Sequence, residues 1–548
     1  MKRFLLIILT LSMLLSLIAC NKKEDKKAGE EKPGNIEVDA WTTHLTDKQI
    51  ANVKEKPKNA STTYDVYMTR GETEGCQLVV YSSEKIRRTT LKFDANKYAD
   101  AGMKMNAFIL NKTVKIKRKE WTDGAIPYYG LKVTVNQKTV VPYIVEFTTT
   151  VDTPAGDYTY TYDFIDTDTN TVHATFTVNV HVWDIVLPEE KTFATSVGLN
   201  GYHMERFDRG ATMHKQYYDL LLEHNICAHS LPVSILSDEG AEYMSDPRVT
   251  SFVIGLWEAD DWTDEKILEY YNRVKENPEW FKKALFYVID EPSDEEALAK
   301  YREICDRFAR LCPGIGVIAP FYTNKQFGEN MDQVDAMAPT TILWCPKLCL
   351  WDEDQSYDRF LNYTPEKTFD ERMKEFQAEG DTVWSYVCNA PLDPYAQLFI
   401  DTEGIVHRIM MWQHYQRDIT GFLYWQTTAW GYRQEGSDMN PWEKAYNGVN
   451  GGNPGEAAGP VYGEGYLLYP GTPVGIGGPV PSSRLKMLRD GIDDIELLYL
   501  AEKEFGKEWV MEKVNEITPT LTSYTDEENF YKLRKEIGDA LEAALAEQ

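Results

Sequence analysis

The stretch FYVIDEPSDEEA, residues 286–297, contains the change of pattern from which the fold can be predicted. An apolar run ends in two adjacent carboxylates, Asp290 and Glu291, and Pro292 should keep the backbone of Glu291 extended. Ser293 then resembles a helix N-cap, followed by three acids in the first turn. The stretch therefore predicts a strand, two acids at its end and a helix. The acids are either a catalytic pair or only the polar end of a strand.

The same alternation of strand and helix repeats along most of the chain. Residues 189–510 contain eight apolar runs separated mostly by helical patterns, which predicts a (β/α)₈ barrel. The segment LSDEGAEYMSDPR, between the second and third runs, instead predicts a loop, and residues 511–548 predict a helical tail. The runs are FATSVGLN, NICAHSLP, TSFVIGL, KALFYVIDEP, GIGVIAPFYT, MAPTTILWCP, DTVWSYVCNA and ITGFLYWQTTAW.

The N-terminal part of the chain has a different pattern. Residues 36–188 hold short segments rich in Val, Thr and Tyr that are separated by turn signals such as DTPAGD, and these are typical of a β-sandwich. The predicted fold class is therefore multidomain α and β, with an N-terminal β-sandwich followed by a (β/α)₈ barrel of the TIM type.

Residues 1–35 have the composition of a targeting segment. MKRFLLIILTLSMLLSLIAC joins a basic start to an apolar run that ends Leu-Ile-Ala-Cys, which resembles a bacterial lipobox. A transmembrane anchor is the alternative, but the short run ending on cysteine favours a lipoprotein. We expect a signal peptide over residues 1–19, lipidation of Cys20 and a disordered tether over 20–35. The expected location is the cell envelope, with a lipid anchor in the membrane, most simply the outer one.

The composition excludes some functions. The net charge of −28 disfavours nucleic acid as a partner. No HExxH or other metal-binding spacing and no phosphate-binding loop occurs, so the sequence predicts no metal and no cofactor. The seven cysteines after Cys20 are expected to be mostly buried thiols, although Cys305–Cys312 and Cys345–Cys349 remain possible bridges.

Barrel enzymes carry their catalytic groups at the carboxyl ends of strands, which is where Asp290 and Glu291 are expected. A retaining glycosidase usually needs a second carboxylate about 5 Å away. The seventh and eighth runs hold no acid; they hold polar and aromatic side chains that suit a sugar, or that are ordinary barrel core. These candidate substrate-binding residues are Trp384, Tyr386, Asn389, Tyr424, Trp425, Gln426 and Trp430.

The absence of a second carboxylate indicates substrate-assisted catalysis. A 2-acetamido sugar supplies its own nucleophile, the amide oxygen, and forms an oxazolinium intermediate. Asp290 would then accept the amide N–H, and Glu291, with its pKa raised by burial, would act as the general acid and base. The expected partner is therefore a glycan that carries a 2-acetamido sugar.

Several motifs together resemble glycoside hydrolase family 123 and the related domain of unknown function 4091 family. They are GETEGCQLVV, VDTPAGDY, FYVIDEP, GFLYWQTTAW and GYLLYPG with the following PVPSSRLKMLRDGIDDIELLYL. The resemblance covers about residues 40 to 505, and its most specific part is 465–500. It implies a sandwich joined to a barrel, β-N-acetylgalactosaminidase activity, Asp290 as the oxazolinium stabiliser and Glu291 as the acid and base.

Other interpretations stay open. The enzyme could act on another sugar with a partner acid after the third or sixth run, among Glu258, Asp260, Asp261, Asp352 and Glu353. Alternatively, the protein could be a glycan-binding lipoprotein without activity.

Two late segments are also informative. In RDGIDDIE the alternating charges predict a structural network that seats the last helix, with a place for Arg484 or Arg489 at the cleft floor as the alternative. The long Gly- and Pro-rich loop 431–478 is expected over the barrel mouth, where Gly463, Glu464 and Tyr469 could contact substrate.

Overall fold

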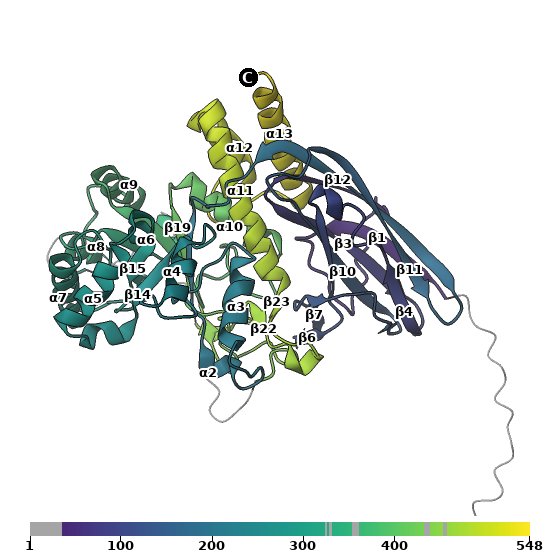
Figure 1. The fold of residues 1–548 in the computed structure, drawn as a ribbon, viewed down its shortest axis with the longest axis horizontal. Helices are drawn as coiled ribbons and strands as arrows, with labels where there is room; N and C mark the ends of the chain where they lie inside the picture. Colours follow the sequence, from purple (N-terminus) through teal and green to yellow (C-terminus); the bar gives the residue numbers. More distant parts are fainter. Residues whose placement is uncertain (1–35, 324–325, 328–330, 353–360, 432–438, 453–456) are drawn as a thin grey trace, which may run out of the picture. The chain divides into compact units, whose positions relative to one another are not determined.

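The computed structural model describes residues 36–323, 326–327, 331–352, 361–431, 439–452 and 457–548. The predicted signal peptide, Cys20 and tether lie outside the described residues, as do Glu353 and parts of the loop 431–478. Residues Val38–Gln548 form one compact unit (Figure 1). None of the described helices is long and apolar enough to cross a bilayer. The predicted boundaries at residues 188 and 510 stay predictions.

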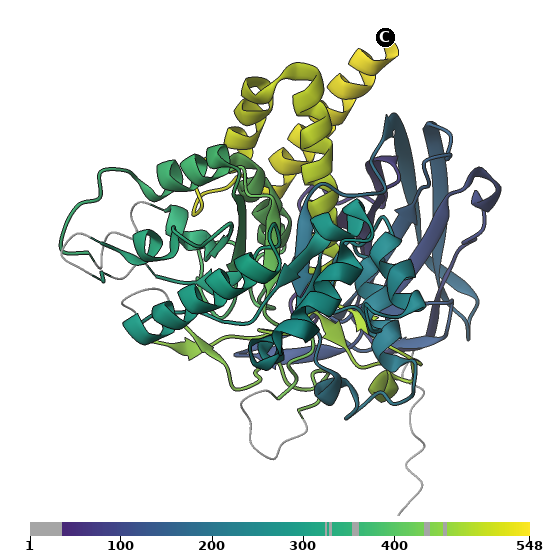
Figure 2. The same cartoon turned by 60° about the vertical axis from the view of Figure 1, so that its left-hand side comes forward.

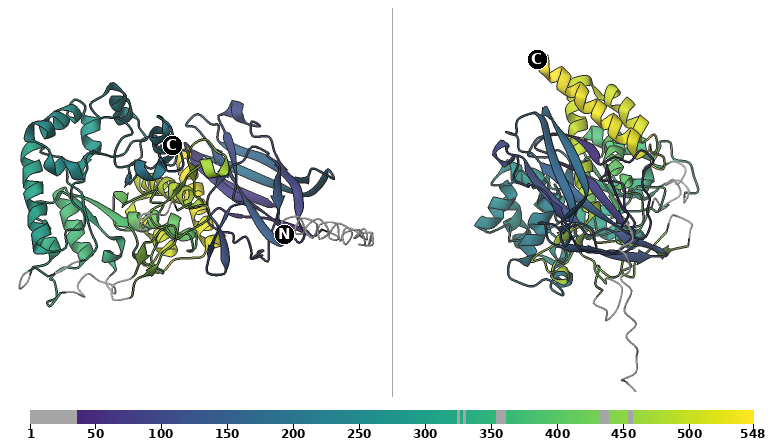
Figure 3. Two further views of the ribbon diagram at one scale, coloured as in Figure 1. Left: turned by 90° about the horizontal axis from the view of Figure 1, so that it is seen from below. Right: turned by 90° about the vertical axis from the view of Figure 1, so that its right-hand side faces the viewer.

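The β-rich N-terminal region is confirmed as two five-stranded sheets that pack face to face (Figure 3). Alternate residues of each strand point into the shared core, which is the period of two that β-strands impose. Neighbouring strands are antiparallel except β2 and β12, which are parallel. The first sheet has the order β1(Val38–His44), β3(Thr73–Ser82), β10(Thr139–Thr148), β5(Lys104–Ile109), β8(Ile126–Pro127), and the second β2(Thr63–Arg70), β12(Thr171–Val186), β11(Gly156–Asp166), β4(Ile86–Lys92), β9(Val133–Val135).

The following region contains parallel strands in the predicted order, but the closed barrel is not confirmed because the sheets are not closed. All of the apolar runs except the second contain a strand. That run, NICAHSLP, has one β-branched residue and contributes only an isolated parallel bridge between Val197 and Ala228. One sheet has the order β13(Ala194–Val197), β19(Gly421–Tyr424), β18(Thr382–Val387), β17(Leu343–Pro346), β16(Ala319–Phe321); β14(Phe252–Gly255) and β15(Ala284–Phe286) form a separate pair.

The parallel strands share an apolar interior. Its members lie in five of the seven strands or, for Tyr287 and Ile318, directly beside β15 and β16; they are Val253, Leu285, Tyr287, Ile318, Leu343, Cys345, Trp384, Tyr386 and Leu423. Gly421 makes room for one of them, because a Cβ atom at this position would lie 2.4 Å from the ring of Trp384. Residues that follow the strands therefore lie at the edge of a filled core and not of a pore.

Helices separate most of the parallel strands (Figure 2), and two of them correct the sequence predictions. The predicted loop 236–248 contains α4, capped by Ser237, whose side chain accepts a hydrogen bond from the Gly240 amide. The N-cap of α7 is Asp294 and not Ser293, since the Asp294 side chain accepts from the Ala297 amide. The helices are α2(Gly201–Met204), α3(Met213–Leu222), α4(Asp238–Ser245), α5(Asp264–Val274), α6(Pro278–Lys283), α7(Glu295–Leu311), α8(Gln333–Met337), α9(Phe369–Glu379) and α10(Ile405–Gln416).

The last helices join the two regions. Buried ion pairs link α11(Ser483–Phe505) to the sandwich region, from Arg484 to Asp123 at 2.8 Å and from Lys486 to Glu146 at 2.8 Å. The predicted structural charge network on this helix is therefore confirmed. The tail consists of α12(Lys507–Ile517) and α13(Glu527–Ala546), as the helical pattern predicts.

The described cysteines are all free thiols, and all except Cys388 are buried. Neither of the two possible bridges, Cys305–Cys312 and Cys345–Cys349, is formed. The sequence prediction of buried thiols is confirmed for six of the seven, and Cys388 is half-buried.

Candidate active site

Asp290 and Glu291 lie four and five residues beyond the end of β15. Glu291 has a φ of +43°, so the prediction of an extended backbone at this residue is wrong. Left-handed φ values are strained for residues with a Cβ atom and concentrate at functional sites. The turn is held by the Glu291 amide, which donates to the carbonyl of Pro320 in β16 over 3.0 Å. A strained backbone turn at Glu291 therefore positions the two acids.

Two buried tyrosines hold the two carboxylates. The hydroxyl of Tyr287 donates to Oδ1 of Asp290 over 3.2 Å, and the hydroxyl of Tyr386 donates to Oε1 of Glu291 over 2.5 Å. Both tyrosines belong to the interior of the parallel strands. The adjacent acids therefore do not diverge into different parts of the structure but lie above one aromatic floor.

The electrostatics of the pair are asymmetric. Desolvation by the surrounding protein, and then the negative charge of Glu291, raise the pKa of Asp290 to about 6. The hydrogen bond from Tyr287 and the charge of Lys347 act in the opposite direction but do not cancel the shift. The Asp290 carboxyl therefore keeps its proton to a higher pH than an aspartate in water does.

Lys347 brings a positive charge to the same edge. It follows β17 directly, and its Nζ atom lies 5.1 Å from the ring centre of Tyr322 and 5.4 Å from that of Tyr386. Burial alone would lower the pKa of Lys347, but Cys388, Cys349 and Glu291 outweigh burial and raise it. Lys347 is therefore an ammonium ion at neutral pH, and it counters the charge of the pair.

Glu464 supplies a third carboxylate that no strand pattern revealed. It lies in the loop after β19 and is 1% exposed, with Oε2 accepting from the hydroxyl of Tyr424 over 3.0 Å and Oε1 accepting from the indole of Trp425. Burial raises the pKa of Glu464 to about 7, although those two hydrogen bonds and the charges of Arg484 and Lys347 oppose the rise. The eighth apolar run contains no acid of its own, but tertiary contacts bring Glu464 to Tyr424 and Trp425 of that run.

Most of the predicted aromatic residues are buried. Trp384 and Tyr424 are buried in the core, and Trp430 is fully buried with its indole donating to the carbonyl of Leu468 over 3.0 Å. Trp425 is half-buried. Its position favours substrate contact over that of the other tryptophans.

The two predicted amides are engaged locally. Asn389 donates from Nδ2 to the carbonyl of Asn450 over 2.7 Å, which ties the end of β18 to the late loop. The side-chain oxygen of Gln426 accepts from the Thr427 amide and the Thr428 hydroxyl. Both residues are half-buried, and their contact with substrate stays a prediction.

Two exposed aromatic residues beside the pair were missed. Trp257 is 49% exposed, and its ring centre lies 4.6 Å from that of Tyr287. Tyr322 is 38% exposed and lies beneath the Lys347 ammonium. One follows β14 and the other follows β16. Barrel enzymes carry functional groups after the carboxyl ends of their strands, so applying this rule to every apolar run predicts both residues.

The alternative partner acids have other surroundings. Asp260 forms an ion pair with Lys300 at 3.1 Å, and Asp352 accepts from the hydroxyl of Tyr395 over 2.7 Å. Glu258 and Asp261 are exposed, and Glu353 lies outside the described residues. The other loop candidate, Tyr469, is buried and donates to Asp123, which favours a structural role.

Comparison with known proteins identifies the part of the chain that holds this site. Residues 261–501 match the family model described as glycoside hydrolase 123, catalytic domain. The match confirms the family resemblance that the sequence motifs carry, and it supports a glycosidase. No curated protein matches the chain.

One solved structure shares the fold of this chain. A family 123 glycoside hydrolase from Clostridium perfringens, studied for glycolipid glycan hydrolysis, is 13% identical, with a TM-score of 0.59. The alignment covers 93% of this chain and 98% of that one, so the two share a fold. A putative glycoside hydrolase from Bacteroides vulgatus is 9% identical over 70% of this chain and 76% of that one, with a TM-score of 0.25.

Proposed function

We propose that this chain is an exo-acting, retaining β-N-acetylhexosaminidase, most simply a β-N-acetylgalactosaminidase, that uses substrate assistance. The observation that carries the proposal is the pair Asp290 and Glu291, each held by a buried tyrosine at the carboxyl-end edge of the parallel strands. The match of residues 261–501 to the family 123 catalytic domain supports the same conclusion.

In the proposed reaction, the carbonyl oxygen of the substrate's 2-acetamido group attacks the anomeric carbon. Glu291 gives its proton to the glycosidic oxygen as that bond breaks, and the alcohol leaves. Asp290, as a carboxylate, accepts the amide N–H and stabilises the positive charge of the oxazolinium ring. Glu291 then takes a proton from water, which attacks the same carbon, opens the ring and restores the amide with net retention.

The surroundings of the pair suit these roles. The hydrogen bond from the Tyr386 hydroxyl fixes the orientation of the Glu291 carboxyl, and the hydrogen bond from the Tyr287 hydroxyl fixes that of Asp290. The exposed rings of Trp257 and Tyr322 offer apolar faces on which a sugar can stack. Lys347 limits the negative charge that the pair would otherwise accumulate.

The experiment that tests the proposal compares aryl β-N-acetylgalactosaminide, its gluco isomer and an aryl β-galactoside without the acetamido group. Glu291→Gln and Asp290→Asn should each lose most activity on the acetamido substrates, and Glu265→Gln, an exposed acid in the first turn of α5, is the matched control. Full activity in both pair variants would sink the proposal. No turnover of any substrate by the wild type would instead favour a glycan-binding protein without activity.

A second candidate function follows from Glu464. A buried carboxyl with a pKa of about 7 beside Trp425 could be the partner of Glu291 in a two-carboxylate glycosidase. In that case the aryl β-galactoside would be hydrolysed at a rate comparable with the acetamido substrate, and Glu464→Gln would abolish both activities. A strict requirement for the acetamido group would exclude it.

The proposal extends to substrate and location. The Clostridium perfringens structure concerns glycolipid glycans, and a lipid-anchored enzyme would meet such glycans at a membrane surface. Lipidation of Cys20 would place this chain in the cell envelope. Radiolabelled palmitate should label the wild type and not Cys20→Ala, and the variant should leave the membrane fraction.

A further inference from the structure

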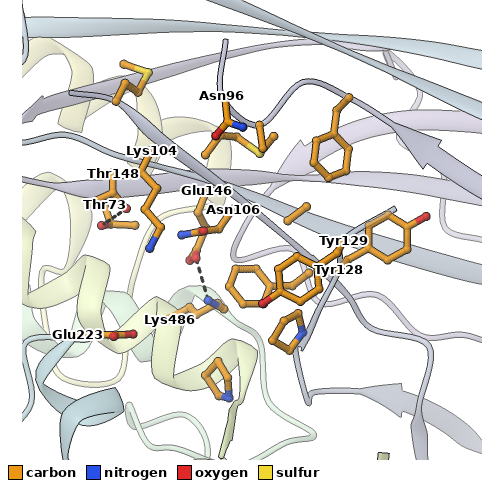
Figure 4. Close-up of a pocket in the computed structure, with 18 of the residues that line it drawn as sticks. Thr73, Asn96, Lys104, Asn106, Tyr128, Tyr129, Glu146, Thr148, Glu223 and Lys486 are labelled. Carbon is orange, nitrogen blue, oxygen red and sulfur yellow. Dashed lines mark hydrogen bonds and ion pairs between the residues drawn. The ribbon is translucent and has the colours of Figure 1, made fainter. Parts of the chain in front are cut away.

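The outer face of the first sandwich sheet is only partly covered. Near the middle of β10, Ile144 packs with Leu110 and with Met487 of α11 in a small apolar cluster. Farther along, the same face of β10 and β5 carries polar residues, among them Lys104 and Asn106. At that point the sheet and the helix separate around a hollow of about 1210 Å³ (Figure 4).

This hollow, which we name the junction groove, has two walls of different origin. Strand residues form one wall and helix residues the other, with aromatic rings at one end, and none of them belongs to the candidate active site. The strand wall includes Thr73, Lys92, Lys104, Asn106, Glu146 and Thr148; the helix wall includes Glu223, His224, Lys486 and Arg489; the rings are Phe93, Phe108, Tyr128 and Tyr129.

The residues that line the junction groove have an excess of positive charge. At the floor, Glu146 receives Lys486 and Arg489, each at 2.8 Å, and Arg489 also pairs at 2.6 Å with Asp490, which is outside the lining. His224 adds no charge, because burial and the cations Lys486 and Arg489 lower its pKa to about 3 and leave it neutral. At the rim, Lys92 and Lys104 outnumber Glu223. The lining therefore has four cations and two carboxylates on a chain whose net charge is −28.

The side chains at the rim are available for a ligand. Among the residues that the structure describes, the Lys104 ammonium and the Asn106 amide have no hydrogen-bond or ion-pair partner, and Tyr129 is 80% exposed. Figure 4 shows Lys104 of the strand wall and Lys486 of the helix wall facing the same space. An uncommitted amide, ammonium and aromatic ring together suit hydroxyl groups, acidic groups and the apolar face of a sugar.

We propose that the junction groove binds an anionic oligosaccharide, a run of sugars that carry carboxylate or sulfate groups. Its volume exceeds the roughly 300–1,000 Å³ of pockets for drug-sized ligands, so several sugar rings fit. The local positive charge attracts an anion, while the acidic remainder of the chain repels nucleic acid. This site goes beyond the proposed function, since binding here requires no turnover.

The test measures binding by calorimetry with detergent-solubilised full chain in a Glu291→Gln background, so that the probes stay intact. The probes are a chondroitin sulfate hexasaccharide, its desulfated form that keeps only carboxylates, and neutral chitohexaose. We expect salt-sensitive binding of the first probe, and comparison with the second separates sulfate from carboxylate recognition. Lys104→Glu with Asn106→Ala should weaken binding at least tenfold.

The matched control is Lys115→Glu, which makes the same charge change at an exposed lysine of β6(Thr113–Ile116) outside the groove. It should bind as the parent does, and Lys104→Glu with Glu291 intact should hydrolyse aryl glycosides at the wild-type rate. Equal affinity in the groove variant and the control would overturn the proposal. Binding of chitohexaose in the groove as tight as that of the acidic sugars would also overturn it, whereas absent hydrolysis would affect only the proposed function.

Discussion

The carboxylates at the edge of the parallel strands differ from those at the junction of α11 with the sandwich. At the junction, Asp494 is fully buried, yet its pKa is lowered, because Arg408 and Arg534 outweigh the effect of burial. At the edge, Asp290 and Glu291 accept hydrogen bonds mainly from neutral tyrosines, and the pKa of Asp290 is raised. Compensated charges stabilise a fold, whereas poorly compensated carboxyls can exchange protons with a substrate.

The largest expected effect breaks the compensated region. Arg408→Met removes the guanidinium that lies 2.7 Å from Asp494 and 2.6 Å from Glu74, and among the described residues only Arg534 is left to compensate both carboxylates. Uncompensated buried charges of this kind cost about 3–5 kcal/mol of unfolding free energy. Denaturant titration at pH 7 measures the loss, and Lys300→Met, which removes an exposed cation, should cost about 1 kcal/mol or less.

The pH dependence of the unfolding free energy tests whether charge causes the loss of stability in Arg408→Met. The lowered pKa of Asp494 stabilises the fold above the unfolded value of about 4, and that contribution is lost as the pH falls. The difference between wild type and Arg408→Met should therefore narrow below about pH 4. A difference that is constant down to pH 3 would mean that packing and not charge is responsible.

Tyr386→Phe tests the other region with a smaller effect. The variant removes the hydroxyl that donates to Glu291 over 2.5 Å, and hydrogen bonds to charged groups contribute about 1.5–3 kcal/mol. We expect kcat on the aryl glycoside to fall by about ten- to a hundredfold, with KM nearly unchanged. Tyr301→Phe, which removes a buried hydroxyl bonded to Thr341 in another part of the structure, should retain wild-type kcat.

The raised pKa of Asp290 predicts an acid limb in the rate profile. The carboxylate form accepts the amide N–H, so kcat/KM should fall as pH drops below about 6, approaching tenfold per pH unit. Tyr287→Phe removes a hydrogen bond that lowers this pKa, and the limb should move to higher pH. A limb near pH 4 in the wild type, or a downward move in the variant, would contradict the assignment.

The smallest expected effect concerns the exposed ring of Trp257. Aromatic contacts contribute about 0.5–1.5 kcal/mol, so Trp257→Ala should raise KM by about two- to tenfold while kcat changes little. Tyr202→Ala removes a comparably exposed ring that follows no strand directly, and it is the control. A Trp257→Ala enzyme with wild-type KM would remove this ring from the binding surface.

Several features of the site depend on contacts that the local sequence pattern does not contain. Trp384 and Trp430 have the residue type that a sugar site needs, but their neighbours bury them. Glu464 was outside the strand pattern because it meets Trp425 from 39 residues away along the chain. The left-handed φ of Glu291 depends on the carbonyl of Pro320 in the next strand, which no local preference encodes.

The sequence by itself determined the order of the elements, the β-rich N-terminal region, the place of Asp290 and Glu291 beyond a strand, and the charge network of α11. These follow from periodicity, composition and spacing, which act over a few residues. Tertiary structure alone decided that the sheets stay open, that Glu464 reaches the strand edge, and that a groove remains beside α11. Burial and the pairing of charges depend on residues that are far apart in the chain, so the local sequence pattern does not predict them.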